Sequence, residues 1–122
     1  MIIANWKNYL PPSDIIKLCD DISDERHLIV APSMAYLGLL KEKYPYLEIA
    51  AQDVSFLIDG YGTYTGETPA SLVSDIGIKY AIIGHSERRL HLFESWQTVI
   101  LKIHNCLNNN LTPVICIGES EE

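Results

Sequence analysis

A short run of polar and ionisable residues follows directly on an apolar run in the second half of the chain. The apolar run Tyr80 to Ile83 predicts a buried strand, Gly84 allows a tight backbone turn, and Ser86 begins a predicted helix. This order places His85 at the C-terminal end of a strand, facing a helix N-terminus. The partial positive charge there disfavours an imidazolium ion, so we expect His85 to be neutral at physiological pH and able to donate a hydrogen bond to an oxygen.

The position of His85 raises the chance that it has a chemical role. A lone histidine is more often a satisfied core or surface residue than a catalyst. In α/β folds, however, ligands gather at the carboxyl ends of the strands, and His85 is predicted to lie at such an end.

A second pair of candidate residues lies near the N-terminus. Asn5 and Lys7 are two positions apart in a predicted strand over residues 2–6 and its end, so we expect both side chains on the same side and Trp6 on the other. A lysine at a strand end has two interpretations. It can extend its ammonium group into water along an apolar surface, or it can point inward to meet a ligand.

Short β-rich runs alternate with helical patterns along the whole chain, which predicts βαβ units and a parallel sheet. Such strands are covered on both faces and therefore read as continuous apolar runs. The five predicted strands are Ile2 to Trp6, Leu28 to Ala31, Leu47 to Ala51, Tyr80 to Ile83 and Pro113 to Ile117.

The connections between these strands carry helix signals. Ser13 is a plausible N-cap for a first helix with Ile15, Leu18, Cys19 and Ile22 on one face, and a second helix is expected from about Ser33 to Tyr44, where Pro45 stops it. Thr68 and Pro69 would start a short helix that Gly77 closes. A further helix is expected from Ser95 to Leu107, with Val99, Ile103 and Leu107 inward, and residues 54–67 form a long loop of the kind that is usually functional.

Composition excludes several classes of function. The net charge of −7 argues against binding to nucleic acid or to anionic membranes, and no apolar run approaches the length of a membrane span. The three cysteines lack a C-x-x-C spacing and the four histidines lack an i, i+4 pair, so neither a disulfide framework nor a metal site is predicted. Reduced thiols and the lack of a signal-peptide pattern favour a cytoplasmic protein.

Five short segments resemble those of the triosephosphate isomerase family, in the same order. They are Ala4-Asn5-Trp6-Lys7, Ala50-Ala51-Gln52, Tyr64-Thr65-Gly66-Glu67, Gly84-His85-Ser86-Glu87-Arg88-Arg89 and Cys116-Ile117-Gly118-Glu119. The family fold is a (β/α)₈ barrel, which typically needs about 250 residues. The resemblance therefore implies an α/β fold, a partial TIM barrel with strands 1–5, in which residues 1–122 form one incomplete domain truncated after the fifth strand.

The resemblance also implies roles for individual residues. The family interconverts dihydroxyacetone phosphate and glyceraldehyde 3-phosphate, a step of glycolysis and gluconeogenesis, and needs no cofactor or metal. By this resemblance His85 is the electrophile that polarises the carbonyl, Lys7 supplies positive charge and Asn5 positions the substrate. Glu87 orients Lys7 or supports the site by hydrogen bonding. Three further charged residues are expected to form structural ion pairs: Arg88, Arg89 and Glu94.

The loop over residues 60–67 resembles the family's dimerisation loop, which implies a homodimer with Thr65, Gly66 and Glu67 at the interface and Ser86 beside the site. For Tyr64 an alternative is packing under its own loop. The sequence departs from the family pattern near this site, with Asn8-Tyr9 for the usual Met-Asn, Asp53 for the usual Asn and Thr63 for the usual Ala.

The resemblance further implies missing parts. In the family the glutamate base and the lid loop follow a sixth strand, and phosphate-binding donors follow the seventh and eighth. We therefore expect the isolated chain to be inactive, with Glu119 only a remote candidate for a substitute base. The alternatives left open are a gene fragment, a partial sequence of a full enzyme, a split enzyme completed by another chain, or a noncatalytic half barrel that binds a phosphorylated ligand or a partner through its open edges.

Overall fold

A computed structural model describes residues 1–58 and 60–118 of the chain. Its centre is one parallel sheet with the strand order β1-β2-β3-β4-β5. The strands are β1 (Ile2–Asn5), β2 (Leu28–Ala31), β3 (Glu48–Ala51), β4 (Tyr80–Ile83) and β5 (Thr112–Ile115). The predicted alternation of strands and helices is confirmed, with shifts of one or two residues at the ends of β1, β3 and β5.

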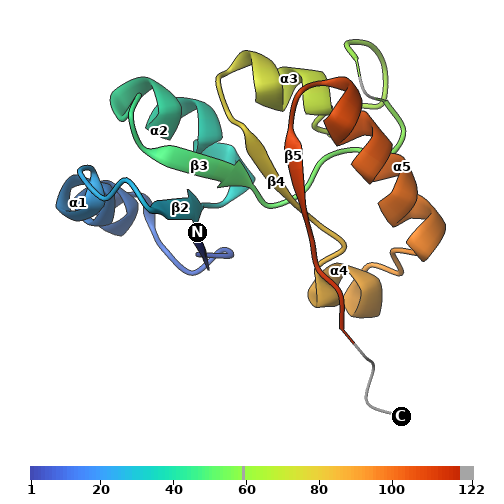
Figure 1. Ribbon diagram of the computed structural model, residues 1–122, viewed down its shortest axis with the longest axis horizontal. Coiled ribbons are helices and arrows are strands. Elements are labelled where there is room, and N and C mark those ends of the chain that lie inside the picture. Colours follow the sequence, from blue (N-terminus) through green and yellow to red (C-terminus); the bar gives the residue numbers. More distant parts are fainter. Residues whose placement is uncertain (59, 119–122) are drawn as a thin grey trace.

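Helices connect successive strands and pack on the sheet (Figure 1). They are α1 (Pro12–Ile22), the 3₁₀ turn η1 (Met34–Tyr36) with α2 (Leu37–Lys43), α3 (Ala70–Asp75), α4 (Ser86–His91) and α5 (Trp96–Asn108). Together with the sheet they form a curled half barrel, which agrees with the partial TIM barrel expected from the sequence. Among the described residues, no helix combines the length and the apolar character that crossing a bilayer requires.

Three expectations about the helices are wrong in detail. Pro11, and not Ser13, occupies the N-cap of α1, because Pro12 with its fixed φ suits the first helical position. In α3 the N-cap is Pro69, one residue after the expected Thr68. In α5 the buried residues are Val99, Lys102 and Cys106, while Leu107 is 59 % exposed.

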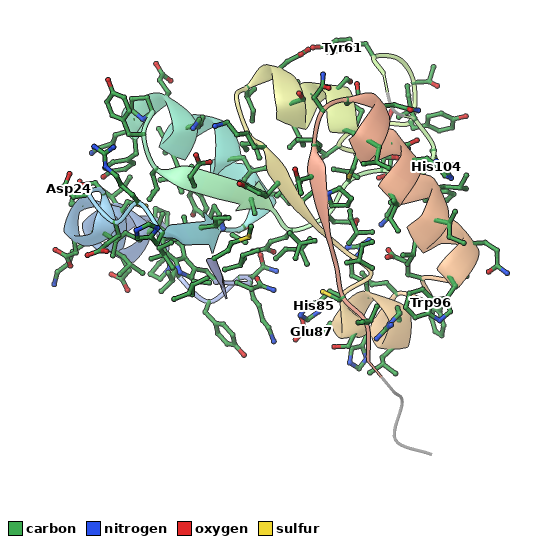
Figure 2. All side chains as sticks on the ribbon, in the orientation of Figure 1. Asp24, Tyr61, His85, Glu87, Trp96 and His104 are labelled. Atoms are coloured by element: carbon green, nitrogen blue, oxygen red, sulfur yellow. The ribbon has the colours of Figure 1, made fainter. Side chains whose placement is uncertain are left out.

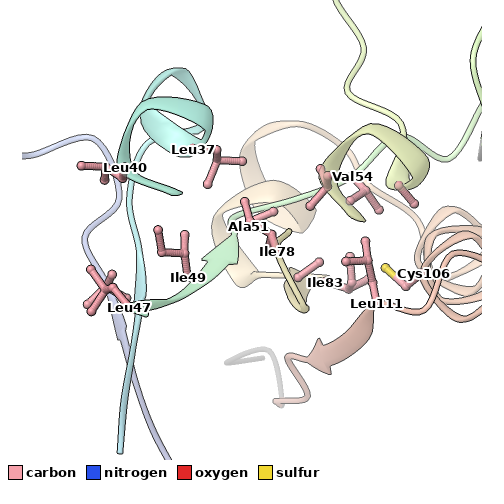
Figure 3. Packing of buried hydrophobic residues seen from close by; sticks show 14 of the residues in the cluster. Leu37, Leu40, Leu47, Ile49, Ala51, Val54, Ile78, Ile83, Cys106 and Leu111 are labelled. Atoms are coloured by element: carbon pink, nitrogen blue, oxygen red, sulfur yellow. The ribbon is translucent and has the colours of Figure 1, made fainter. Parts of the chain in front are cut away.

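Apolar side chains cover both faces of the sheet, because alternate strand residues point to opposite faces. The cluster on one face is larger than that on the other. Between the sheet and the helices lies the main core, in which Leu37 and Leu40 of α2 pack near Ile49 of β3, and Ile83 of β4 packs near Cys106 of α5 (Figure 3). The opposite face carries a smaller cluster of Ile29, Ala31, Ala50 and Ile82, with Ile3, Tyr80 and Cys116 packed against it. The smaller cluster faces the concave side of the half barrel.

The sheet has two open edges. β1 pairs with β2 and β5 pairs with β4, so within residues 1–58 and 60–118 each of these two strands has a neighbour on one side only. Pro113 lies in β5, where an edge strand tolerates the missing backbone donor. The open edges predicted from the sequence are thereby confirmed for the described chain. Glu119, which ends the fifth family-like segment, lies outside the described residues.

Candidate active site

A cavity of about 560 Å³ opens at the carboxyl ends of four neighbouring strands, β1 to β4. Its lining includes Asn5 and Lys7 from the end of β1, Gln52 after β3, and His85 and Glu87 from the start of α4. Figure 2 shows His85 and Glu87 next to each other at the end of α4 that follows β4. The tertiary structure thus brings together the four residues that the resemblance singled out as catalytic or substrate-binding.

Lys7 lies in a turn beyond β1, not on the strand as expected, and its φ of 50° falls in the left-handed region. A non-glycine residue adopts this conformation at a cost of about 1–2 kcal/mol, so the surroundings must hold it there. Two hydrogen bonds do so. The Lys7 N–H donates to Oδ1 of Asn5 at 2.9 Å, and Nε2 of Gln52 donates to the Lys7 carbonyl oxygen at 2.7 Å.

The side chain of Lys7 is paired with that of Glu87. The ammonium Nζ lies 2.5 Å from Oε1 of Glu87, and both side chains are partly exposed to the cavity. The hydrogen bond from Lys7 holds the pKa of the Glu87 carboxyl below its usual value, and the same bond raises the pKa of Lys7. At neutral pH the pair is therefore a fixed ammonium and carboxylate.

His85 occupies the N-cap of α4, as its place between Gly84 and Ser86 predicted. Gly84 has a φ of 73°, which a glycine adopts without strain, and the chain turns there from β4 into the helix. Nδ1 of His85 accepts a hydrogen bond from the Glu87 backbone N–H at 3.2 Å. An Nδ1 in this role holds no proton of its own, so the ring proton of neutral His85 is on Nε2 and is available for donation.

The four residues that the resemblance placed at the dimer interface or beside the site, Ser86, Thr65, Gly66 and Glu67, do not line this cavity. Ser86 is exposed as the first residue of α4, and Thr65 and Gly66 are exposed in the long loop. Glu67 borders a separate cavity with Arg88 and Lys102. Tyr64 is 49 % exposed in the same loop.

Beside the cavity lies a group of four charged residues, which we call the buried charge cluster: Asp53, Arg88, Glu94 and Lys102. Lys102 is 2 % exposed, and its Nζ lies 2.7 Å from both carboxylate oxygens of Asp53 and 2.6 Å from Oε2 of Glu94. Arg88 reaches Asp53 at 3.0 Å and Glu94 at 2.9 Å. The ion-pair role predicted for Arg88 and Glu94 is seen here, whereas the guanidinium of Arg89 lies over the Trp96 ring.

Sequence reasoning missed Lys102 and the clamp made by Gln52. A signal for Lys102 was present, because it lies three residues after Val99 and four before Cys106, on the stripe of α5 that is buried. Gln52 stands in the family-like segment Ala50-Ala51-Gln52, but that segment does not indicate which groups it binds. Its two acceptors, the carbonyl oxygens of Lys7 and Ala31, belong to loops or strands that only the sheet brings close.

The sequence of the chain was compared with those of known proteins. A family model described as triosephosphate isomerase matches residues 1–122. The chain belongs to the triosephosphate isomerase family. Triosephosphate isomerases of Orientia tsutsugamushi (strain Ikeda) and Francisella tularensis subsp. mediasiatica (strain FSC147) are each 37 % identical to it, over 100 % and 98 % of this chain. That of Synechococcus sp. (strain WH7803) is 30 % identical over 100 % of the chain.

The chain spans about half the length of these curated triosephosphate isomerases, namely 52 %, 49 % and 53 % of each. Within residues 1–58 and 60–118, no group of three or more His, Cys, Asp or Glu side chains is arranged to hold a metal ion. The residues that meet at the cavity carry an imidazole, an ammonium group, an amide and a carboxylate. The imidazole and the ammonium group can stabilise negative charge on a substrate oxygen.

Proposed function

We propose that this chain supplies the electrophilic part of a triosephosphate isomerase site and binds a small phosphorylated triose. The observation that carries the proposal is the convergence of Lys7 and His85 on one cavity at the carboxyl ends of the strands. Family membership supplies the reaction, the interconversion of dihydroxyacetone phosphate and glyceraldehyde 3-phosphate through an enediolate.

In this reaction negative charge develops on the substrate oxygen when the adjacent carbon loses a proton. The Nε2–H of His85 would donate to that oxygen, and the Lys7 ammonium would stabilise both the oxygen and the phosphate group. Glu87 keeps Lys7 charged and fixes its position through the 2.5 Å contact. Asn5 contributes by holding the turn from which Lys7 projects.

We further propose that the 122-residue chain is inactive by itself. Among the described residues, the carboxylates that border the cavity are Asp53 and Glu87, and both are paired with cations. Neither is free to remove a proton from carbon. By the family resemblance the base follows a sixth strand, so the proposed complete site needs further βα units, and loss of the base alone is expected to lower the rate by about 10²–10⁴-fold.

An isomerase assay and a binding titration with dihydroxyacetone phosphate test the two parts of the proposal. The purified chain should show no turnover above buffer, and turnover that His85→Ala abolishes would overturn the claim of inactivity. In NMR the ligand should shift the amide signals of Lys7 and His85. Lys7→Met should remove these shifts, whereas the matched change Lys79→Met, at a partly exposed ion pair away from the cavity, should not. Shifts that persist in Lys7→Met would refute the binding site.

Complementation tests the need for the remaining units. The C-terminal half of the Orientia tsutsugamushi relative, added as a separate chain, should restore turnover that depends on His85.

The same proposal includes a cytoplasmic location and a homodimer formed through the loop over residues 60–67. The exposure of Thr65 and Gly66 supports the homodimer. Sedimentation of the complemented protein, with and without a change at Thr65, measures the dimer.

A second candidate function is a noncatalytic half barrel that binds a partner chain. The open edges of β1 and β5 favour it, because unpaired strand edges readily accept another strand. The two candidates differ in outcome: a partner-binding module would form a complex with the second chain without turnover and without shifts from dihydroxyacetone phosphate.

A further inference from the structure

We propose that Asp53 is a positioning residue, which anchors helix α4 to the sheet through Arg88 and Lys102 and thereby sets the geometry of His85 and Glu87. The importance of this geometry for catalysis rests on the proposed function. Its evidence is the geometry of the buried charge cluster and the place of each member in the fold.

The cluster is balanced in charge. Two cations, Arg88 and Lys102, meet two carboxylates, Asp53 and Glu94. Nζ of Lys102 has three carboxylate oxygens within hydrogen-bond distance, two of Asp53 and one of Glu94, and an ammonium group has three hydrogens to donate. Burial raises the pKa of the Asp53 carboxyl, and the Lys102 and Arg88 cations oppose that rise.

Asp53 is the member of the cluster that lies next to a strand of the sheet. It follows β3 directly, separated from Ala51 only by Gln52. Arg88 lies in α4, Lys102 lies in α5, and Glu94 lies between these helices with its backbone N–H bonded to the Arg88 carbonyl. Glu94 can therefore join the two helices to each other, but the contact of Asp53 with both cations ties them to the end of β3.

Asp53 and Arg88 are each adjacent in sequence to a residue that contacts Lys7. Gln52, beside Asp53, clamps the backbone of Lys7, and Glu87, beside Arg88, pairs with the ammonium of Lys7. The Arg88 backbone N–H also donates to the His85 carbonyl at 2.9 Å. A shift of Arg88 would therefore move both partners of the site, the imidazole and the carboxylate, relative to Lys7.

The aspartate at position 53 gives the cluster its second carboxylate. An asparagine of the same shape would leave Arg88 and Lys102 facing the single carboxylate of Glu94. In this chain the aspartate restores the balance, and loss of one partner from such a buried group leaves an uncompensated charge.

Asp53→Asn tests the proposal. Glu48→Gln, in the strand that precedes Asp53, is the matched control, since Glu48 pairs with Lys79 at 3.4 Å near the surface. The readouts are the ring ¹⁵N signals of His85 and the pH titration of the Glu87 carboxyl by ¹³C NMR. We expect Asp53→Asn to replace the single Nε2–H tautomer by exchanging tautomers and to move the titration midpoint of Glu87 upward. Glu48→Gln should change neither.

Unchanged His85 and Glu87 signals in Asp53→Asn would overturn the proposal, whether or not the protein becomes less stable. If Asp53→Asn does not fold, the double variant Asp53→Asn with Lys102→Met removes one buried cation as well. It should fold and still show altered His85 signals, and wild-type signals there would refute the anchor. Because these readouts need no ligand, failure of dihydroxyacetone phosphate binding would count against the proposed function and not against the anchor.

Discussion

The ammonium nitrogen of Lys7 lies 2.5 Å from Oε1 of Glu87, a residue 80 positions further along the chain. One partner follows β1 and the other lies in the first turn of α4, so the contact joins the edge of the sheet to the helix that carries His85. This pair fixes the charge at the mouth of the cavity. Several measurable consequences depend on it and on the structure around it.

Removing the ammonium group should change the titration of Glu87. The hydrogen bond from Lys7 depresses the pKa of Glu87, so in Lys7→Met the midpoint of the Glu87 carboxyl should rise toward its usual value. In the wild-type chain the pair stabilises the fold above the usual carboxyl pKa, and this contribution is lost as pH falls through the depressed value. Carboxyl ¹³C NMR checks the midpoint, and an unchanged value in Lys7→Met would show that the pair does not form in solution.

Gly84→Ala should destabilise the chain by about 1–3 kcal/mol. A Cβ at this position would lie 3.2 Å from a methyl carbon of Val99, and the φ of 73° disfavours any other L-residue. Gly38→Ala is the matched control, because a Cβ there meets nothing within 4 Å and alanine favours α2 by about 1 kcal/mol. Urea unfolding measures both, and equal stability of the two variants would contradict the close approach of β4 and α5.

Lys102→Met should lower the free energy of unfolding by about 3–5 kcal/mol, because it leaves the carboxylates of Asp53 and Glu94 with Arg88 as their remaining cation. Lys79→Met removes an equally long side chain from an exposed pair and should cost less than about 1 kcal/mol. Thermal and urea unfolding of both variants supply the comparison. A loss for Lys102→Met no larger than that for Lys79→Met would mean that the buried charge cluster contributes little to stability.

The buried thiols should be unreactive in the folded chain. Cys19 and Cys106 are 0 % exposed, and burial raises the pKa of each to about 11. A thiol reagent at pH 7 should therefore label Cys116 first, since this residue is partly exposed, and label the other two only on unfolding. Mass spectrometry of the labelled peptides is the check. Labelling of Cys19 at the same rate as Cys116 would indicate that α1 opens readily from the sheet.

Much of the architecture was predictable because it depends on neighbours in sequence. The apolar run of β4, the glycine that turns the chain and the start of α4 at Ser86 are local features, and each was predicted correctly. Helix caps were less predictable. Proline competed with Ser13 and Thr68 for the first positions of α1 and α3, and sequence alone does not rank these two signals.

The site itself was predictable only in part. The family-like segments named Asn5, Lys7, His85 and Glu87, and the structure brings them to one cavity, while their chemical roles stay predictions. The turn conformation of Lys7 was not foreseen, because the strand pattern runs through Asn5 and the clamp from Gln52 comes from a different strand end.

By itself the sequence determined the order of strands and helices, their parallel arrangement and the family to which the chain is similar, since hydrophobic period, turn residues and motifs are written in consecutive positions. Only the tertiary structure decided that Lys7 pairs with Glu87 and that Asp53 ties two helices to the sheet. The reason is physical. Such contacts join residues far apart in the chain, and their geometry depends on strand register, sheet curl and the burial of charge, which no local pattern specifies.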